Sequence, residues 1–212
     1  MHQVTPLVES KRGRLVIHGS AIAHAGSAVA LVGPSGAGKS TLAASFAVSG
    51  SPFLTDDALY LRREAGHYLV EPSRATLRLW SDSRQRLFGS AVAVAPPLAY
   101  TDKEQLFACP EVPHCADALP LPVIYFLQEA RGNDIAFARL SQREAALALM
   151  RNSFLLDIES RQEIGAHFSG FADVAESVPC FSLVYPRQYK KLPEVRAAIA
   201  AHLAELNDSA RS

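Results

Sequence analysis

The sequence predicts an α/β fold for three reasons. Short apolar runs typical of buried strands alternate with segments whose composition and capping residues favour helices. A glycine-rich segment, Gly33 to Ser40, stands between one such run, Ala28–Val32, and an alanine-rich stretch. A further short strand, Phe53–Thr55, follows, and strand, helix and strand over this distance are typical of a βαβ unit. We therefore expect the strands at Ala28–Val32 and Phe53–Thr55 to be parallel.

More strands are predicted in the first half of the chain. Ala25-Gly26-Ser27 is a turn between two short apolar runs, and Glu64-Ala65-Gly66 has the composition of a hairpin turn. Gly50-Ser51-Pro52 ends the alanine-rich stretch, which is long enough for a helix. The predicted elements are strands at Leu15–His18, Ala21–Ala25, Ala58–Arg63 and His67–Glu71, and a helix at Thr41–Ser49.

Strands and helices are predicted in the second half of the chain as well. Ser141 and Glu144 form a capping-box pattern, which marks the start of a helix. Pro72–Pro122 shows no clear periodicity apart from a polar helical segment near Ser81–Phe88. The other predicted elements are strands at Val123–Leu127, Ala136–Leu140 and Cys180–Tyr185, and helices from Ser141 to about Phe154, at Ile158–Val178 and at Pro193–Leu206.

Composition and charge limit the class of protein. The 212 residues include 21 basic and 21 acidic ones, so neither nucleic acid nor an anionic membrane is expected as an obligatory partner. No apolar run reaches the roughly 18 residues of a membrane helix. Met1–Arg14 also lacks the apolar core of a signal peptide. We expect one cytoplasmic domain over residues 1–212, with flexibility, if anywhere, in about residues 1–13.

The three cysteines do not suggest a disulfide framework, because their number is odd and their spacing irregular. Cys109 and Cys115 are expected to be loop thiols, since no fourth metal ligand stands nearby. Cys180 lies in an apolar run and is expected to be a buried core residue.

A complete phosphate-binding pattern, a P-loop, follows the strand that ends at Val32. Its glycines let successive backbone N–H groups face one anion, and the next helix points its positive end at the same place. Lys39 can reach the β- and γ-phosphates of a nucleotide, and Ser40 can bind the Mg²⁺ that bridges them. We expect the chain to bind ATP, or another nucleoside triphosphate, with Mg²⁺. The expected nucleotide-binding residues are Gly33, Pro34, Ser35, Gly36, Ala37, Gly38, Lys39, Ser40 and Thr41.

Two adjacent aspartates, Asp56 and Asp57, end the strand after this helix, beside the P-loop. One carboxylate can hold Mg²⁺, directly or through water, and the other can take a proton from an attacking hydroxyl. His18 ends a strand expected next to that of the P-loop and is a further catalytic candidate. Basic or aromatic candidates that could equally be surface or core residues are Arg74, Arg78, Lys103, Trp80 and the cluster Arg187, Lys190 and Lys191.

These residues together resemble the catalytic domain of the HPr kinase/phosphorylase family of bacterial serine kinases. That family carries a His-Gly pair, a P-loop and an Ala-Asp-Asp or similar triplet. Here His18-Gly19, Gly33–Ser40 and Thr55-Asp56-Asp57 stand at the same intervals. Looser matches are to the shorter HPr kinase-related proteins, some of which phosphorylate lasso-peptide precursors. These matches are at Pro72–Phe88, Asp102-Lys103, Pro120–Leu127 and Tyr185-Pro186-Arg187.

The resemblance implies a P-loop kinase-like fold of the HPr kinase C-terminal domain type, with a central mixed β-sheet flanked by helices. It implies ATP-dependent transfer of the γ-phosphate to a serine of a small protein or peptide, such as a lasso-peptide precursor, and homo-oligomeric assembly. The implied roles are phosphate and Mg²⁺ binding by Lys39 and Ser40, general base for Asp56, metal or substrate binding by Asp57, and tuning of Asp56 by His18.

Two other functions stay open: a nucleotide-dependent regulatory ATPase or switch, and a small-molecule kinase. The paired aspartates favour a kinase, because a kinase needs a base for an incoming hydroxyl. The family's downstream Glu-X-Arg-Gly signature has no counterpart here, and Leu79-Trp80-Ser81-Asp82 stands roughly in its place. We therefore expect the reverse reaction, phosphorolysis of the product, to be weak or absent.

Overall fold

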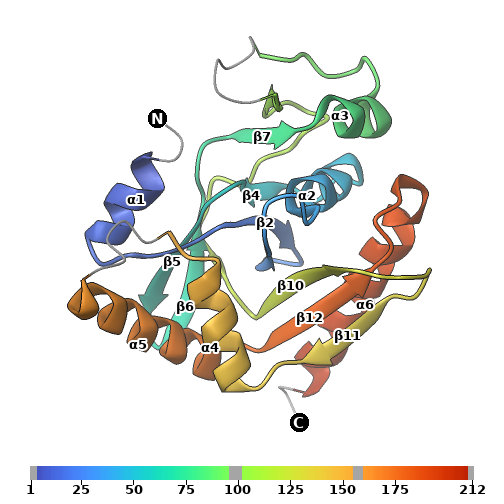
Figure 1. The fold of residues 1–212 in the computed structure, drawn as a ribbon. Coiled ribbons are helices and arrows are strands. Elements are labelled where there is room, and N and C mark those ends of the chain that lie inside the picture. Colours follow the sequence, from blue (N-terminus) through green and yellow to red (C-terminus); the bar gives the residue numbers. More distant parts are fainter. Residues whose placement is uncertain (1–3, 96–101, 155–159, 210–212) are drawn as a thin grey trace.

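Helices flank a central β-sheet in the computed structural model, which describes residues 4–95, 102–154 and 160–209 (Figure 1). The strands are β1 (Leu15–Ile17), β2 (Gly19–His24), β3 (Ser27–Val32), β4 (Phe53–Thr55), β5 (Leu59–Glu64), β6 (His67–Glu71), β7 (Thr76–Leu79), β8 (Glu104–Phe107), β9 (Leu119–Pro120), β10 (Val123–Glu129), β11 (Ala136–Arg139) and β12 (Cys180–Tyr185). The helices are α1 (Val4–Lys11), α2 (Lys39–Val48), α3 (Ser81–Phe88), α4 (Gln142–Arg151), α5 (Arg161–Ser177) and α6 (Leu192–Ser209), with a short 3₁₀ helix at Tyr189–Lys191.

The central sheet is mixed, as the family resemblance implied. Its strand order is β11-β12-β10-β3-β2-β4. Strand β10 is parallel to both β12 and β3, whereas β2 is antiparallel to both β3 and β4. Strands β3 and β4 therefore run in the same direction, which confirms the predicted parallel orientation. They are not neighbours, however, because β2 lies between them.

Apolar side chains alternate between the two faces of this sheet. On β3, Val29 and Leu31 join a buried cluster with residues of α2 and α6. Ala28, Ala30 and Val32 point to the other face and join a cluster with residues of α4, α5 and the β5–β6 hairpin. Strand β3 is thus buried on both faces, which matches its continuous apolar sequence.

A second sheet, with the order β1-β5-β6-β9, packs beside the central one. Its β5–β6 hairpin has the predicted turn, where Ala65 and Gly66 both have positive φ, as a two-residue type I′ turn requires. Strand β1 pairs with β5, so the expectation that this strand adjoins the P-loop strand was wrong. His18 instead occupies the link between β1 in one sheet and β2 in the other.

A third, two-stranded sheet lies in the region where the sequence showed no clear pattern. Strand β7 pairs with β8, which is about 25 residues later in the chain, and α3 follows β7 at the predicted residues. Strand β9 and helix α1 were not predicted either. Such pairings between distant segments leave no local signature in the sequence.

Several helix boundaries differ from the predictions: α2 begins at Lys39 and not at Thr41, and α6 ends at Ser209 and not at Leu206. The capping box of α4 is present, but this helix ends at Arg151, because the Asn152 side chain donates to the Ala148 carbonyl oxygen at 2.8 Å. Ser153 then bridges to β1. Ser160 caps α5, and the predicted start at Ile158 lies outside the described residues. Helix α6 begins one residue early.

Cys180 is buried, as predicted, and burial raises the pKa of its thiol to about 12. Cys109 and Cys115 are partly exposed thiols. Within the described ranges, no helix has both the length and the apolar character needed to cross a membrane.

Candidate phosphoryl-transfer site

The P-loop joins buried strand β3 to helix α2 and is supported by the end of β12. Gly36 and Gly38 adopt left-handed backbone conformations, with φ of 81° and 92°. A Cβ atom at Gly38 would lie 2.6 Å from the Tyr185 hydroxyl oxygen, so the loop needs glycine there. That hydroxyl donates to the Ala37 carbonyl oxygen at 3.3 Å, and Arg187 donates to the Gly36 carbonyl oxygen while pairing with Glu129.

Lys39 is almost fully buried inside this loop. Its ammonium group donates to the carbonyl oxygens of Gly33 and Pro34 at 2.7 and 2.9 Å. Burial lowers the pKa of Lys39 to about 8; the nearby Asp56 carboxylate opposes this shift, and Lys103 adds to it. A phosphate group at the loop would restore charge compensation to this desolvated cation.

Asp56 accepts hydrogen bonds from three donors. Oδ1 accepts from the Ser40 hydroxyl at 2.8 Å and from the Ser20 hydroxyl at 2.6 Å. Oδ2 accepts from the backbone N–H of Arg78 at 2.9 Å. Both carboxylate oxygens are therefore engaged, and the residue is tied directly to the P-loop serine.

Asp57 is held differently, in a left-handed conformation with φ of 70°. Its carboxylate forms an ion pair with Arg78 from β7, and its backbone carbonyl accepts from the N–H of Gly19 at 3.3 Å. A non-glycine residue with positive φ is strained, and such strain is enriched at functional sites.

His18 contacts the same carbonyl. Its Nδ1 lies 3.0 Å from the Asp57 carbonyl oxygen, which can only accept, so Nδ1 carries the proton. Burial, followed by repulsion from Lys39, lowers the pKa of His18 to about 4, so the ring is neutral at pH 7. The ring also packs edge-on against Phe154, with centroids 5.9 Å apart. Among the described residues its hydrogen bond goes to Asp57 and not to the Asp56 carboxylate.

Two cavities meet at Asp57 and Arg78, which line both. The loop cavity, of about 70 Å³, is lined by the P-loop and by His18, Trp80 and Lys103. The outer cleft, of about 340 Å³, is lined by α1, β5, β7, the segment between β6 and β7, and both aspartates. The aspartate pair thus forms a wall between the phosphate-binding loop and a larger space.

The structure brings most of the predicted site residues together. Ser35, Gly36, Gly38, Lys39, Ser40 and Thr41 line the loop cavity, whereas Gly33, Pro34 and Ala37 contribute carbonyl oxygens that hold the loop. Of the secondary candidates, Arg78, Lys103 and Trp80 also line this cavity, while Arg74 lines the outer cleft. Trp80 is 48% exposed, so it is not a core residue.

The sequence did not identify Ser20 or Tyr185 as site residues, and it named Arg187 only as part of a basic cluster that could be a solvated surface. Ser20 is fully buried on β2, next to the P-loop strand. A serine in an otherwise apolar strand was the only available signal for it. Arg187 reaches the P-loop from beyond β12, and only the three-dimensional structure shows that contact. Lys191 pairs with Glu194 at 2.8 Å, as expected of a solvated cluster.

The donor set suits Mg²⁺. The Ser40 hydroxyl and the Asp56 carboxylate are hard oxygen ligands held within hydrogen-bond distance of each other, and Mg²⁺ takes such ligands alongside phosphate oxygens and water. The contact of Ser40 is with Asp56, whereas the family resemblance implied Asp57 as the metal-binding aspartate.

Comparison with known proteins adds little to this geometry. No protein-family model and no curated protein matches the chain. Among solved structures, the chain is similar to the HPr(Ser) kinase/phosphatase from Coxiella burnetii, with 10% sequence identity and a TM-score of 0.48, over 90% of this chain and 97% of that chain. At this level of similarity, the chemistry of the chain has to be inferred from its own residues.

Proposed function

We propose that this chain is an ATP-dependent serine kinase of the HPr kinase-like type, which transfers the γ-phosphate of ATP to a serine hydroxyl of a small protein or peptide. One observation carries the proposal. The P-loop serine is hydrogen-bonded to Asp56, and the adjacent Asp57 lines both the loop cavity and the outer cleft. A phosphate donor and a hydroxyl acceptor could therefore meet at this wall from opposite sides.

The residues of the loop cavity have distinct parts in the proposed reaction. Backbone N–H groups of the P-loop and the Lys39 ammonium bind the β- and γ-phosphates. Ser40 and Asp56 would hold Mg²⁺, which would supply positive charge against the phosphate oxygens. Arg78 and Lys103 line the same cavity and add positive charge beside the transferring group.

Asp57 is the proposed proton acceptor. Both oxygens of Asp56 are already engaged by donors, and only Asp57 of the pair lines both cavities. The serine oxygen attacks the γ-phosphorus, the bond to the β,γ-bridging oxygen breaks, ADP leaves, and the serine proton passes to the Asp57 carboxylate. The transition state of phosphoryl transfer is loose, so the reaction needs little basicity from the proton acceptor. Arg78, paired with Asp57, holds this carboxylate in place.

The experiment is a transfer assay with γ-labelled ATP, Mg²⁺ and a panel of serine-containing peptides and proteins, chiefly those encoded beside this chain. Lys39→Ala should lower transfer by about a hundredfold or more, because it removes a cation that contacts the transferring group. Lys11→Ala, at an exposed position on α1, is the matched control and should behave like the parent.

Three outcomes of this assay would contradict the proposal. The first is ATP consumption that no acceptor increases, which would favour the regulatory ATPase. The second is labelling of small metabolites alone, which would favour a small-molecule kinase. The third is parental transfer by Lys39→Ala.

A further inference from the structure

The outer cleft has the position and size of an acceptor site. Its volume of about 340 Å³ lies within the usual range for ligand pockets. Its wall includes Asp57, the proposed proton acceptor, and the rest comes from elements outside the P-loop. Apolar contacts are available from Pro6, Ala58, Tyr60 and Pro72, which also line it.

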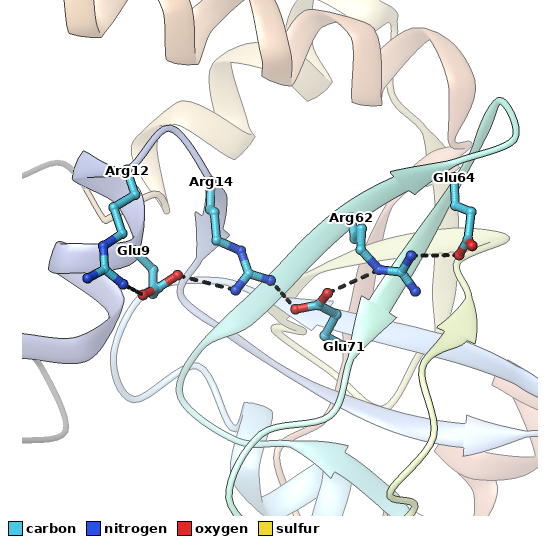
Figure 2. Close-up of polar contacts among 6 residues, drawn as sticks. All are labelled: Glu9, Arg12, Arg14, Arg62, Glu64 and Glu71. Atoms are coloured by element: carbon cyan, nitrogen blue, oxygen red, sulfur yellow. Dashed lines mark hydrogen bonds and ion pairs between the residues drawn. The ribbon is translucent and has the colours of Figure 1, made fainter.

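The carboxylates at the α1 end of this cleft are already compensated by arginines. Figure 2 shows a chain of ion pairs that runs from α1 to the β5–β6 hairpin. Glu9 pairs with Arg14 at 3.2 Å, Arg14 pairs with Glu71, and Glu71 pairs with Arg62 at 3.1 Å. The same figure shows this chain extended at its ends by Arg12 and Glu64. We call these six residues the ion-pair ladder.

The charges at the aspartate end are compensated as well. Asp57 is paired with Arg78, and Asp56 accepts from three donors. Three arginines line the cleft among the described residues. Arg14 and Arg78 form ion pairs, whereas Arg74 does not. Its side chain is exposed and forms no ion pair or hydrogen bond with any residue in the described part of the chain. It lies close enough to Tyr60 to influence that phenol electrostatically.

Strand β7 presents one backbone edge to the aspartates. Strand β7 pairs with β8 along one edge, and the N–H of Arg78 points from the other edge to Asp56. An extended residue directs its carbonyl to the same side as its N–H, so the Arg78 carbonyl also faces the aspartates. The N–H groups of Thr76 and Arg78 on this edge already donate to the Arg74 carbonyl oxygen and the Asp56 carboxylate, at 2.7 and 2.9 Å. Side chains of the cleft, and not pairing with β7, therefore have to recognise an acceptor.

These observations together carry one inference, which rests on the proposed kinase function. We propose that the outer cleft binds a serine-containing peptide segment with an acidic side chain close to the acceptor serine, and that Arg74 recognises this acidic group. The cleft has one uncompensated cation and no uncompensated carboxylate among the described residues that line it. An acidic acceptor therefore gains a charge pair there, and a basic acceptor gains none.

The test uses the full chain and a set of serine peptides that differ at one position near the serine, where glutamate, glutamine or lysine is placed in turn. The parent should phosphorylate the best glutamate peptide with a kcat/KM about five- to tenfold above that of its glutamine counterpart. This is the size expected of a partly exposed arginine–carboxylate pair. Arg74→Ala should remove the preference mainly through KM, and Arg74→Glu should reverse it in favour of lysine. The matched control, Arg131→Ala at an exposed loop position, should keep the parental preference.

A binding measurement separates failure of this inference from failure of the kinase proposal. Fluorescence anisotropy of the labelled peptides is recorded with a non-hydrolysable ATP analogue and Mg²⁺, and it needs no catalysis. Tighter binding of the glutamate peptide, lost in Arg74→Ala, supports the inference even if no transfer occurs. Equal binding of the three peptides, or an Arg74→Glu variant that keeps the parental order, overturns it. If the parent transfers phosphate to serine peptides without a charge preference, the inference fails and the kinase proposal stands.

Discussion

The loop cavity and the outer cleft share a wall, but they hold their charges in different ways. In the loop cavity, burial lowers the pKa of Lys39 to about 8 and that of His18 to about 4. In the outer cleft, Glu9 and Glu71 are paired with arginines at a partly exposed surface. Desolvation therefore lowers the pKa of the basic groups on one side of the wall, whereas on the other side ion pairs compensate the charges.

This difference predicts where substitutions matter most. A buried cation that is held by backbone carbonyl oxygens, as Lys39 is, gains strongly from an incoming phosphate, so changes around the P-loop should have large effects. Ion pairs that water can reach contribute little to stability and weaken further in salt. Changes in the ion-pair ladder should therefore have small effects on folding.

The largest of these effects is expected at Gly38. Its left-handed backbone and the Tyr185 hydroxyl leave no room for a side chain, so Gly38→Ala should lower the free energy of unfolding by about 1–3 kcal/mol. Nucleotide affinity should fall at least about tenfold as the loop shifts. Urea denaturation and nucleotide titration measure both quantities.

Gly165→Ala is the control for this change. Gly165 lies within α5, and no described residue outside its own helical turn comes within 4 Å of the place that an added Cβ atom would take. Alanine should therefore raise stability by about 0.5–1 kcal/mol. A Gly38→Ala variant with parental stability and affinity would show that the P-loop is less constrained than its contacts indicate.

His18 should make the free energy of unfolding depend on pH, with an effect smaller than that of Gly38→Ala and larger than that of changes in the ion-pair ladder. The folded pKa of about 4 lies below the ordinary value of 6.5, so the unfolded chain takes up the proton first as the pH falls. His18 should therefore reduce stability progressively from pH 6.5 down to pH 4, and the loss should stay constant below that. His18→Gln keeps a donor for the Asp57 carbonyl and removes the titration.

Denaturant unfolding at several pH values checks this expectation. The parent should lose more stability than His18→Gln between pH 6.5 and pH 4. The matched variant His67→Gln, at an exposed position on β6, should retain the parental slope. Identical slopes for the parent and His18→Gln would mean that the ring is not desolvated as described.

The smallest effect is expected in the ion-pair ladder. Arg14 joins Glu9 and Glu71, and its side chain is 35% exposed. Arg14→Gln should lower the free energy of unfolding by about 1 kcal/mol or less at low salt, and by less in 1 M NaCl. Thermal melts at both salt concentrations measure this, and a loss above about 3 kcal/mol in high salt would show that the ladder behaves as a buried network.

The two cavities also differ in how far the sequence predicts them. Half of the residues that line the loop cavity come from the P-loop and Thr41, and Asp57, which follows the next strand, lines it as well. Local chemistry is enough to recognise such a site, because the glycines, lysine and serine each have a fixed part in phosphate binding.

The outer cleft could not be predicted because it depends on contacts between distant segments. Helix α1 contacts β1 and reaches His167 of α5 through Ser10, and β7 pairs with β8, which follows about 25 residues later in the chain. The insertion of β2 between β3 and β4 likewise follows from strand order and not from any local pattern. This insertion brings Ser20 beside Asp56, which explains why sequence reasoning missed that residue.

The central claim is that Asp56 binds Mg²⁺ and that Asp57 accepts the serine proton. Replacing each aspartate by asparagine tests this claim most directly. Mg·ATP affinity by calorimetry and single-turnover phosphate transfer are measured for Asp56→Asn and Asp57→Asn. Asp56→Asn should weaken Mg·ATP binding about tenfold or more, because the amide replaces the carboxylate that holds Ser40 and the metal. Asp57→Asn should bind Mg·ATP nearly as well as the parent and lose transfer by about a hundredfold or more. If Asp56→Asn instead binds Mg·ATP with parental affinity while transfer collapses, Asp56 is the base and the proposed assignment is wrong.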